Sequence, residues 1–231
     1  EPKTAPYYRV DKVAAWLILS RMYLNGEVYT RVPATNDSPE VPGQTYYDEA
    51  AEYAHKVVSS SYELATVFKH LFMGDNAGVL DESSVNTAPQ EIIFAFPADG
   101  IKTTSWGSSL FLIASTRTSG MPEWGTSEGW GGNRLRPTVT KTFFPGIILV
   151  SNKKDLTTGL SSNYKDDRAL IYGDTDRTLS VSNIGKFKEG YSAIKFSNVR
   201  ADGGVTKDPK YVDMDFPFMR KAEAYLIYAE A

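Results

Sequence analysis

Apolar residues recur at the spacing of a helix in the first third of the chain. Residues 10–25 are apolar on nearly every side, which predicts a helix buried between neighbours and ended at Gly26. Residues 46–59 are apolar along one side and predict a partner helix, and residues 64–72 predict a further short one. The segment between the first two, residues 27–44, contains Pro, Asn and Gly and is expected to be a loop.

The last stretch, residues 215–231, has the composition of a helix from end to end. Asp215 can cap it, and Arg220 and Glu223 can pair across one turn. Four apolar residues at helical spacing form a stripe that we expect to face the rest of a bundle: Phe218, Ala222, Tyr225 and Ala229. Because no Gly, Pro or cationic turn stops this helix, we expect the chain to be part of a longer one.

The middle of the chain lacks helical periodicity. Residues 91–96 form a short β-type run that Pro97 ends, and residues 191–196 are a second strand candidate. Residues 119–136 make a loop rich in Gly, Trp and polar residues. Long loops on a helical scaffold commonly carry function, so the ligand site is expected in this middle part.

Composition excludes several classes of protein. A hydrophobic fraction of 42% is enough to build a core. The net charge of −3, with both signs scattered, gives no electrostatic reason to expect a nucleic-acid partner. The absence of cysteine removes disulfides, thiolate metal sites and cysteine nucleophiles, and no apolar run is long enough to span a bilayer.

Few residues suggest catalysis or metal binding. His55 and His70 are far apart in sequence and lack a Glu-x-x-His context for zinc, and Asp174 with Asp176 is a weak calcium pattern. No nucleophile elbow, phosphate-binding loop or dinucleotide fingerprint is present. We therefore predict no catalytic residue, no cofactor and no metal site.

Three tryptophans are the candidate ligand contacts. Trp106, Trp124 and Trp130 lie in polar, glycine-bearing segments, where an exposed ring could stack on the CH-rich face of a sugar. Covering half of a ring of about 200 Å² at about 25 cal/mol per Å² contributes about 2.5 kcal/mol. The nearby polar residues that could hydrogen-bond sugar hydroxyls are Arg117, Glu123, Asn133 and Arg134.

Other interpretations of these residues stay open. The tryptophans could instead pin the loops to the body of the protein, and the polar residues could be solvated loop side chains. Glu123 and Glu128 flank Trp124, and two carboxylates across a cleft would suit a glycosidase. Closeness in sequence does not establish that geometry.

Residues 16–23 carry a repeat signature. Trp16, Leu19, Ser20 and Tyr23 fall at the offsets of the first helix of a tetratricopeptide repeat, with Ser where Gly is usual. A small residue there would let a second helix approach closely. The pattern favours a helical-repeat scaffold.

The last helix segment carries the pattern Arg220-x-Ala222-Glu223-x-Tyr225-Leu226, just after Asp-x-Pro. Further short motifs precede it in the chain, at residues 21–25, Tyr62-x-Leu64, 71–72, 91–94, 129–132, Asp167-Arg168 and 191–198. In this order the motifs together resemble the SusD/RagB family of surface glycan-binding lipoproteins of Bacteroidetes, and the pattern at Arg220 is the most specific of them.

The resemblance implies a mainly α, SusD-like fold: a tetratricopeptide-type helical scaffold with a long loop-rich region and a few short strands. It implies one domain over residues 1–231, incomplete at both ends, with helical parts at 1–75 and 213–231 and a loop-rich, ligand-binding part at 76–212.

The resemblance also implies a role. The protein would bind polysaccharides without catalysis and deliver them to a SusC-like TonB-dependent transporter. It would sit at the cell surface on the outer membrane, through an N-terminal lipid anchor absent from this chain. Two alternatives remain open: a helical-repeat adaptor that binds protein and no sugar, and an endo-glycosidase.

Overall fold

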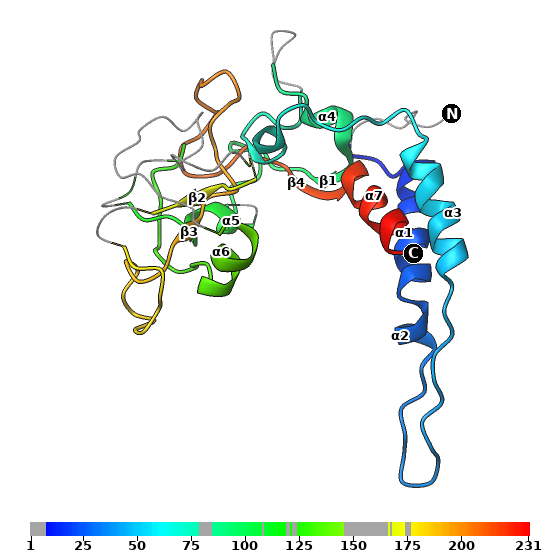
Figure 1. Ribbon diagram of the computed structural model, residues 1–231. Helices are drawn as coiled ribbons and strands as arrows, with labels where there is room; N and C mark the ends of the chain where they lie inside the picture. The colour runs from blue at the N-terminus through cyan, green and yellow to red at the C-terminus, as the bar shows by residue number, and fades with distance from the viewer. Residues whose placement is uncertain are drawn as a thin grey trace. The chain divides into compact units, whose positions relative to one another are not determined.

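The structure is a computed structural model, and it divides into two compact units (Figure 1). Unit 1 comprises residues up to Leu64, Pro89–Phe96 and Pro217–Ala231, and unit 2 comprises Ala65–Ala88 and Pro97–Phe216. The residues described are 8–78, 85–107, 109–118, 121, 124–145, 166, 168–173 and 177–231. Among them helices outweigh strands, so the expectation of a mostly helical chain with a few short strands is confirmed.

Three helices form the body of unit 1: α1 (Lys12–Leu24), α3 (Tyr47–Val58) and α7 (Lys221–Glu230), with the short α2 (Gly26–Thr30) following α1. Asp11 caps α1, because its carboxylate accepts a hydrogen bond from the Ala14 N–H at 2.8 Å. The helix α1 packs against α3 and α7 (Figure 1). The residues buried in the core between them include Val13, Leu17, Ala54, Val57, Ile93, Met219 and Ile227.

The first predicted helix is present, but it is not covered on every side. Ile18 and Met22 on α1 are 38% and 53% exposed, because α3 and α7 cover only part of its circumference. Ser20 is fully buried, and its hydroxyl donates to the Leu17 carbonyl at 2.8 Å. The short helix expected over 64–72 is limited to a 3₁₀ helix at Phe68–Phe72.

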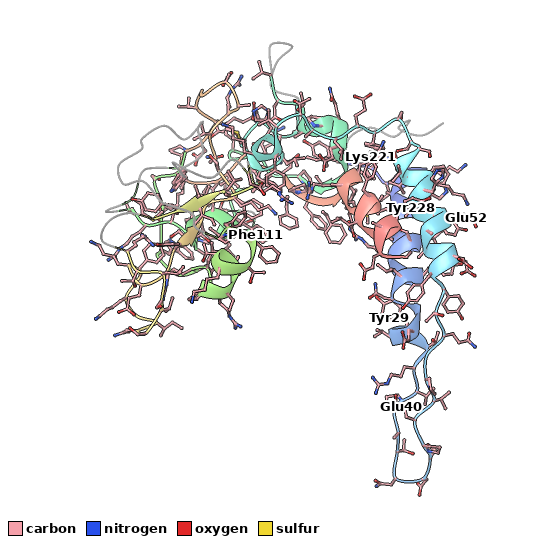
Figure 2. The ribbon with its side chains drawn as sticks, in the orientation of Figure 1. Tyr29, Glu40, Glu52, Phe111, Lys221 and Tyr228 are labelled. Atoms are coloured by element: carbon pink, nitrogen blue, oxygen red, sulfur yellow. The ribbon has the colours of Figure 1, made fainter. Side chains whose placement is uncertain are left out.

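An arm formed by residues 31–44 connects α2 to α3. Val32 and Val41 pair in an isolated antiparallel bridge, and Arg31 forms an ion pair with Glu40 at 2.8 Å. Figure 1 shows the arm running out from α2 and returning to α3, and Figure 2 labels Glu40 on it. The expected loop is therefore present, and its two sides pair with each other.

The prediction of a helix from residue 215 onward is wrong at its start. Phe216–Arg220 is the strand β4, which pairs with β1 (Ile92–Phe96), and helix α7 begins only at Lys221. Met219 is buried while Phe218 is 43% exposed, which is the alternation of a strand. Pairing with β1 prevails over the local helix propensity of this segment. Asp215 is not a helix cap but a fully buried side chain, whose Oδ1 accepts from the Ala98 N–H at 2.7 Å.

The predicted apolar stripe of the last helix is also wrong. The buried residues of α7 are Lys221, Ala224 and Ile227, whereas Tyr225 is 43% exposed and Ala229 is exposed. Phe218 lies on β4 and not on the helix, and the face of α7 that is buried carries Lys221, Ala224 and Ile227 instead of the stripe residues.

Two ion pairs replace the one expected within this segment. Arg220 on β4 reaches the buried carboxylate of Glu91 at 2.7 Å, and Glu223 on α7 pairs with Arg21 on α1. Lys221, labelled in Figure 2, donates its ammonium group to the carbonyls of Ser60 and Tyr62, and burial lowers the pKa of this lysine. The charged side chains of Arg220, Lys221 and Glu223 therefore each bind a different segment of unit 1.

Regular structure is sparse in the described part of unit 2. It contains α5 (Leu110–Ile113), α6 (Pro137–Phe143) and an antiparallel pair of two-residue strands, β2 (Ile171–Tyr172) with β3 (Ser192–Ala193). The short helix α4 (Ala88–Glu91) precedes β1. The strand candidate at 191–196 is thus reduced to two residues.

Buried side chains hold the loops of unit 2 in place. The Asn198 amide donates to the carbonyls of Gly125 at 2.9 Å and Asp208 at 3.0 Å, and its oxygen accepts from the Asp213 N–H at 2.9 Å. Asn76 binds the backbone of Asp215 in the same two-sided way, through both its amide nitrogen and its oxygen. Buried backbone groups need partners, and here side-chain amides supply them where no sheet or helix does.

Candidate functional site

The candidate site is built on two short backbone segments of unit 2 that run side by side. Arg117 and Trp130 face each other in an isolated antiparallel bridge, and the Trp130 N–H donates to the Ile113 carbonyl at 2.9 Å. Gly129 lies so close to Arg117 that a Cβ would approach its Cα to 2.7 Å, and Gly131 has a φ of +65°. The two glycines around Trp130 are therefore required by the backbone that presents its ring.

Trp130 has an exposed ring that is held in place by contact with other aromatic residues. Its side chain is 54% exposed, and the Trp106 ring meets it edge-on with centroids 5.1 Å apart at 64°. Tyr211 contacts Trp106 at 5.2 Å, and the Lys210 ammonium lies 5.4 Å from the Trp106 ring. Edge-to-face contacts fix ring orientation, so Trp130 is a held aromatic surface rather than a loose side chain.

Trp124 is placed differently from the other two candidates. Its side chain is 3% exposed and packs in the core of unit 2, with the Tyr172 ring 6.1 Å away at 74°. Since its faces are covered, it offers no stacking surface in this structure. Its indole Nε1 is buried, and none of the residues that the structure describes accepts a hydrogen bond from it.

The polar candidates divide in a similar way. Asn133 is exposed, and its backbone N–H donates to Ala114. Arg134 donates from all three guanidinium nitrogens to backbone carbonyls, at 2.6 to 2.9 Å. Arg134 therefore links neighbouring loops through their backbones. Glu123 lies outside the described residues. Of the six residues predicted to bind ligand, the structure brings Trp106 and Trp130 into direct contact.

Sequence reasoning missed Lys210 and Tyr211, which reach the site from a turn about 80 residues further along the chain. Both backbone N–H groups donate to Asp208 Oδ1, at 2.7 and 2.9 Å, and these bonds lower the pKa of Asp208. An Asp two residues before the turn signals the turn itself. Nothing in the sequence signals which loop it meets.

A charge cluster anchors the segment that leads to Trp106. Lys207 pairs with Asp99 at 2.8 Å, and hydrogen bonds from Lys207 and from the backbone of Lys102 and Ile101 lower the pKa of Asp99 to about 2. Asp213 is buried and accepts from the Gly100 N–H at 2.8 Å. The loops on either side of Trp106 and Tyr211 are thereby tied together.

Two hollows adjoin these residues. One is open to solvent, and its walls include Ser105 and Gly107, the two neighbours of Trp106 in the chain, and Val212. The other is small and lies where Trp124 meets the segments carrying Arg117 and Glu128. Both have mixed polar and apolar walls, as ligand-binding surfaces do.

Within the described ranges, no three His, Asp or Glu side chains gather into a set that could hold a metal ion. No helix in that same part of the chain has the length and apolar character needed to cross a bilayer.

A scan of protein-family models finds no match. The chain is 37% identical over 258 aligned residues, along its whole length, to the starch-binding protein SusD of Bacteroides thetaiotaomicron, and it spans 44% of that protein. A crystal structure of a SusD superfamily protein from Parabacteroides distasonis matches 96% of this chain and 39% of that one. The TM-score is 0.52 and the identity 18%, which shows likeness of fold.

Proposed function

Because the chain belongs to the SusD family, we propose that it binds glycans at the cell surface and passes them on chemically unchanged. Proteins of this family are binding proteins without catalytic activity. The recipient is a SusC-like TonB-dependent transporter, and the place is the outer face of the outer membrane. That residues 1–231 form part of one SusD-like domain stays a prediction.

The observation that carries the proposal is the Trp130 ring, 54% exposed and held edge-on by Trp106. A flat aromatic face open to solvent on a loop costs hydration free energy unless something covers it. A pyranose ring suits it, because its CH-rich face is apolar while its hydroxyls can reach flanking polar groups. Covering half of such a ring contributes about 2.5 kcal/mol, the scale of weak, repeated binding along a polymer.

The ligand proposed for the first test is an α-glucan of the starch type. The relative found is named for starch binding, and it aligns with the whole of this chain.

The remainder of the chain would serve as scaffold. We propose that α1 and α3 are a helix pair of the tetratricopeptide type, with the buried Ser20 on the face where they pack. In the adaptor alternative Trp130 would instead anchor a protein partner, since Trp is enriched at the energetic centres of protein interfaces. A glycosidase would require a second carboxylate across from Glu128, and its sequence candidate, Glu123, is outside the described residues.

Affinity electrophoresis of the intact protein through gels containing amylopectin tests the proposal. Wild type is expected to be retarded, and Trp130→Ala should weaken binding about 60-fold, as loss of about 2.5 kcal/mol implies. Tyr29→Ala is the matched control, because Tyr29 is 67% exposed on α2 and far in sequence from the site. No retardation of wild type by any of a panel of polysaccharides would favour the adaptor, and release of reducing ends would favour the enzyme.

A further inference from the structure

The arm between α2 and α3 is a hairpin with two different faces. Beyond the bridge between Val32 and Val41, the Thr35 N–H donates to the Ser38 carbonyl at 2.9 Å, which continues the same pairing register to the tip. Bridge partners project their side chains to the same side, and every second residue of an extended segment shares a side. One face of the arm therefore consists of apolar residues only: Val32, Ala34, Pro39 and Val41.

The opposite face of the arm is polar. Arg31 and Glu40 form their ion pair there at 2.8 Å, and the hydroxyls of Thr35 and Ser38 lie 2.8 Å apart in a hydrogen bond. Strands with one apolar and one polar face are typical of a sheet that packs on one side and meets water on the other. The sequence of the arm is therefore patterned for a surface that covers it.

Within the part of the chain that the structure describes, the apolar face of the arm is open to solvent. Val32 and Val41 are 52% and 53% exposed, and Ala34 and Pro39 are exposed as well. The arm extends away from the helices at its base (Figure 1). A two-stranded hairpin alone is marginally stable in water and gains stability when one face packs against another surface. Contiguous exposed apolar residues of this kind mark interaction sites.

The charges around the arm indicate which kind of surface fits it. Residues 26–49 contain one basic side chain, Arg31, and five acidic ones: Glu27, Asp37, Glu40, Asp48 and Glu49. Their net charge of −4 exceeds the −3 of the whole chain, and all six side chains are exposed. Two copies of this acidic surface would repel each other. A partner with Lys or Arg around an apolar centre would complement it.

We propose that the apolar face of the arm docks onto the transporter, at a surface with basic residues around an apolar centre. The inference rests on the proposed function, which names the transporter as the protein partner, and deepens it by giving that partner a surface. This surface belongs to unit 1, whereas Trp106 and Trp130 belong to unit 2. Docking and glycan binding should therefore respond to different substitutions.

Biolayer interferometry of the intact protein against the detergent-solubilised transporter tests the apolar contact. The double variant Val32→Thr/Val41→Thr keeps the β-branched shape and adds two hydroxyls to the apolar face, so the dissociation constant should rise about tenfold or more. Val205→Thr, the same exchange at a 90% exposed bridge residue of unit 2, should leave it unchanged. Gels containing amylopectin should retard both variants as much as wild type.

A second pair of substitutions tests the charges without altering the apolar face. Glu27→Gln with Glu49→Gln should weaken transporter binding about threefold, because charges at the rim of an interface chiefly raise the association rate. Wild-type affinity should fall as the ionic strength rises from about 0.05 to about 0.5 M, and less so in this variant. Glu230→Gln, at an exposed carboxylate of α7, is the control and should change neither.

The outcomes separate this inference from the proposed function. Unchanged affinity of the Val32→Thr/Val41→Thr variant overturns the inference, while the transporter remains the partner. A wild-type dimer in light scattering that this variant dissociates would assign the face to a second copy and also overturn it. Wild type that binds amylopectin but not the transporter refutes the inference together with the delivery step. Wild type that binds the transporter and no glycan refutes glycan binding alone.

Discussion

The two units of this protein reach an ordered state by different physical means. In unit 1, α1, α3 and α7 bury apolar faces against one another, and ion pairs such as Arg21–Glu223 connect neighbouring elements. In unit 2, short pieces of regular structure are linked by loops whose backbone groups are satisfied by buried side chains such as Asn198. A helical scaffold depends on periodicity, whereas a loop-built unit depends on single polar residues.

The comparison teaches where binding surfaces can be built. Loops freed from regular hydrogen-bonding can place rings such as Trp106, Trp130 and Tyr211 from distant parts of the chain on one surface. The helices of unit 1 all pack through apolar faces, which restricts where their side chains can be placed on the surface. Four substitutions would break or sharpen this contrast, from the largest expected effect to the smallest.

Asn198→Ala is expected to be the most damaging change. It removes three hydrogen bonds and leaves the Gly125 and Asp208 carbonyls and the Asp213 N–H without this partner in the interior, a loss of about 4 kcal/mol. Hydrogen exchange should show lost protection within unit 2 while α1 and α3 remain protected. Asn183→Ala, at an exposed turn, is the control, and equal effects of the two would contradict the role given to Asn198.

Arg220→Ala tests the corresponding connection in unit 1. Glu91 is 3% exposed, and loss of its arginine partner leaves a buried carboxylate poorly compensated, at a cost of about 3 kcal/mol in the free energy of unfolding. Arg31→Ala breaks the exposed pair with Glu40 and should cost less than about 0.5 kcal/mol. Urea denaturation of both variants measures the difference, and similar midpoints would show that the Arg220–Glu91 pair adds nothing.

Gly131→Ala probes the presentation of the Trp130 ring. A Cβ at φ +65° costs about 1–2 kcal/mol and would meet the Phe187 ring at 3.2 Å, so glycan affinity should fall several-fold as Trp130 shifts. Gly203→Ala carries the same backbone strain at φ +83° with no atom within 4 Å. It should lower stability similarly and leave affinity unchanged. A loss of affinity in both variants would point to general destabilisation.

The smallest expected effect concerns acid stability. The Lys207 ammonium and backbone N–H groups lower the pKa of Asp99 in the folded state to about 2, below its ordinary value of 3.8. The stabilisation is present above about pH 4 and is lost as the pH falls towards 2. Asp99→Asn should flatten the fall of melting temperature over that interval, most clearly at low salt. An unchanged slope would mean that Asp99 does not contribute.

Sequence patterns predicted secondary structure best where the spacing of neighbouring residues alone determines it. The spacing of Val13 and Leu17 suffices to predict α1, and the β-type run before Pro97 suffices for β1. Residues 216–220 could not be assigned locally, because only β1, more than a hundred residues earlier, makes them a strand. For the same reason, Arg220 lies on β4 and forms its ion pair with Glu91, not with Glu223 as the sequence suggested.

The candidate site shows the same limit. Trp124 and Trp130 have similar polar, glycine-containing neighbours in sequence, yet one is 3% and the other 54% exposed. What separates them is contact with remote segments: Asn198 bonds the backbone of Trp124, and Trp106 supports the ring of Trp130. Composition could therefore nominate the tryptophans, but tertiary contacts assign their roles.

The arm between α2 and α3 has a consequence for how this protein can vary and be engineered. Its ends are already held together by α1 packing on α3 and by the Val32–Val41 bridge, so the length of the tip beyond that bridge affects stability mainly through the entropy of closing a loop. Doubling or halving such a segment changes that entropy cost by only about 0.6 kcal/mol. Residues 33–40, at its exposed tip, are therefore the place to insert a fluorophore, an epitope or a tether without disturbing either unit.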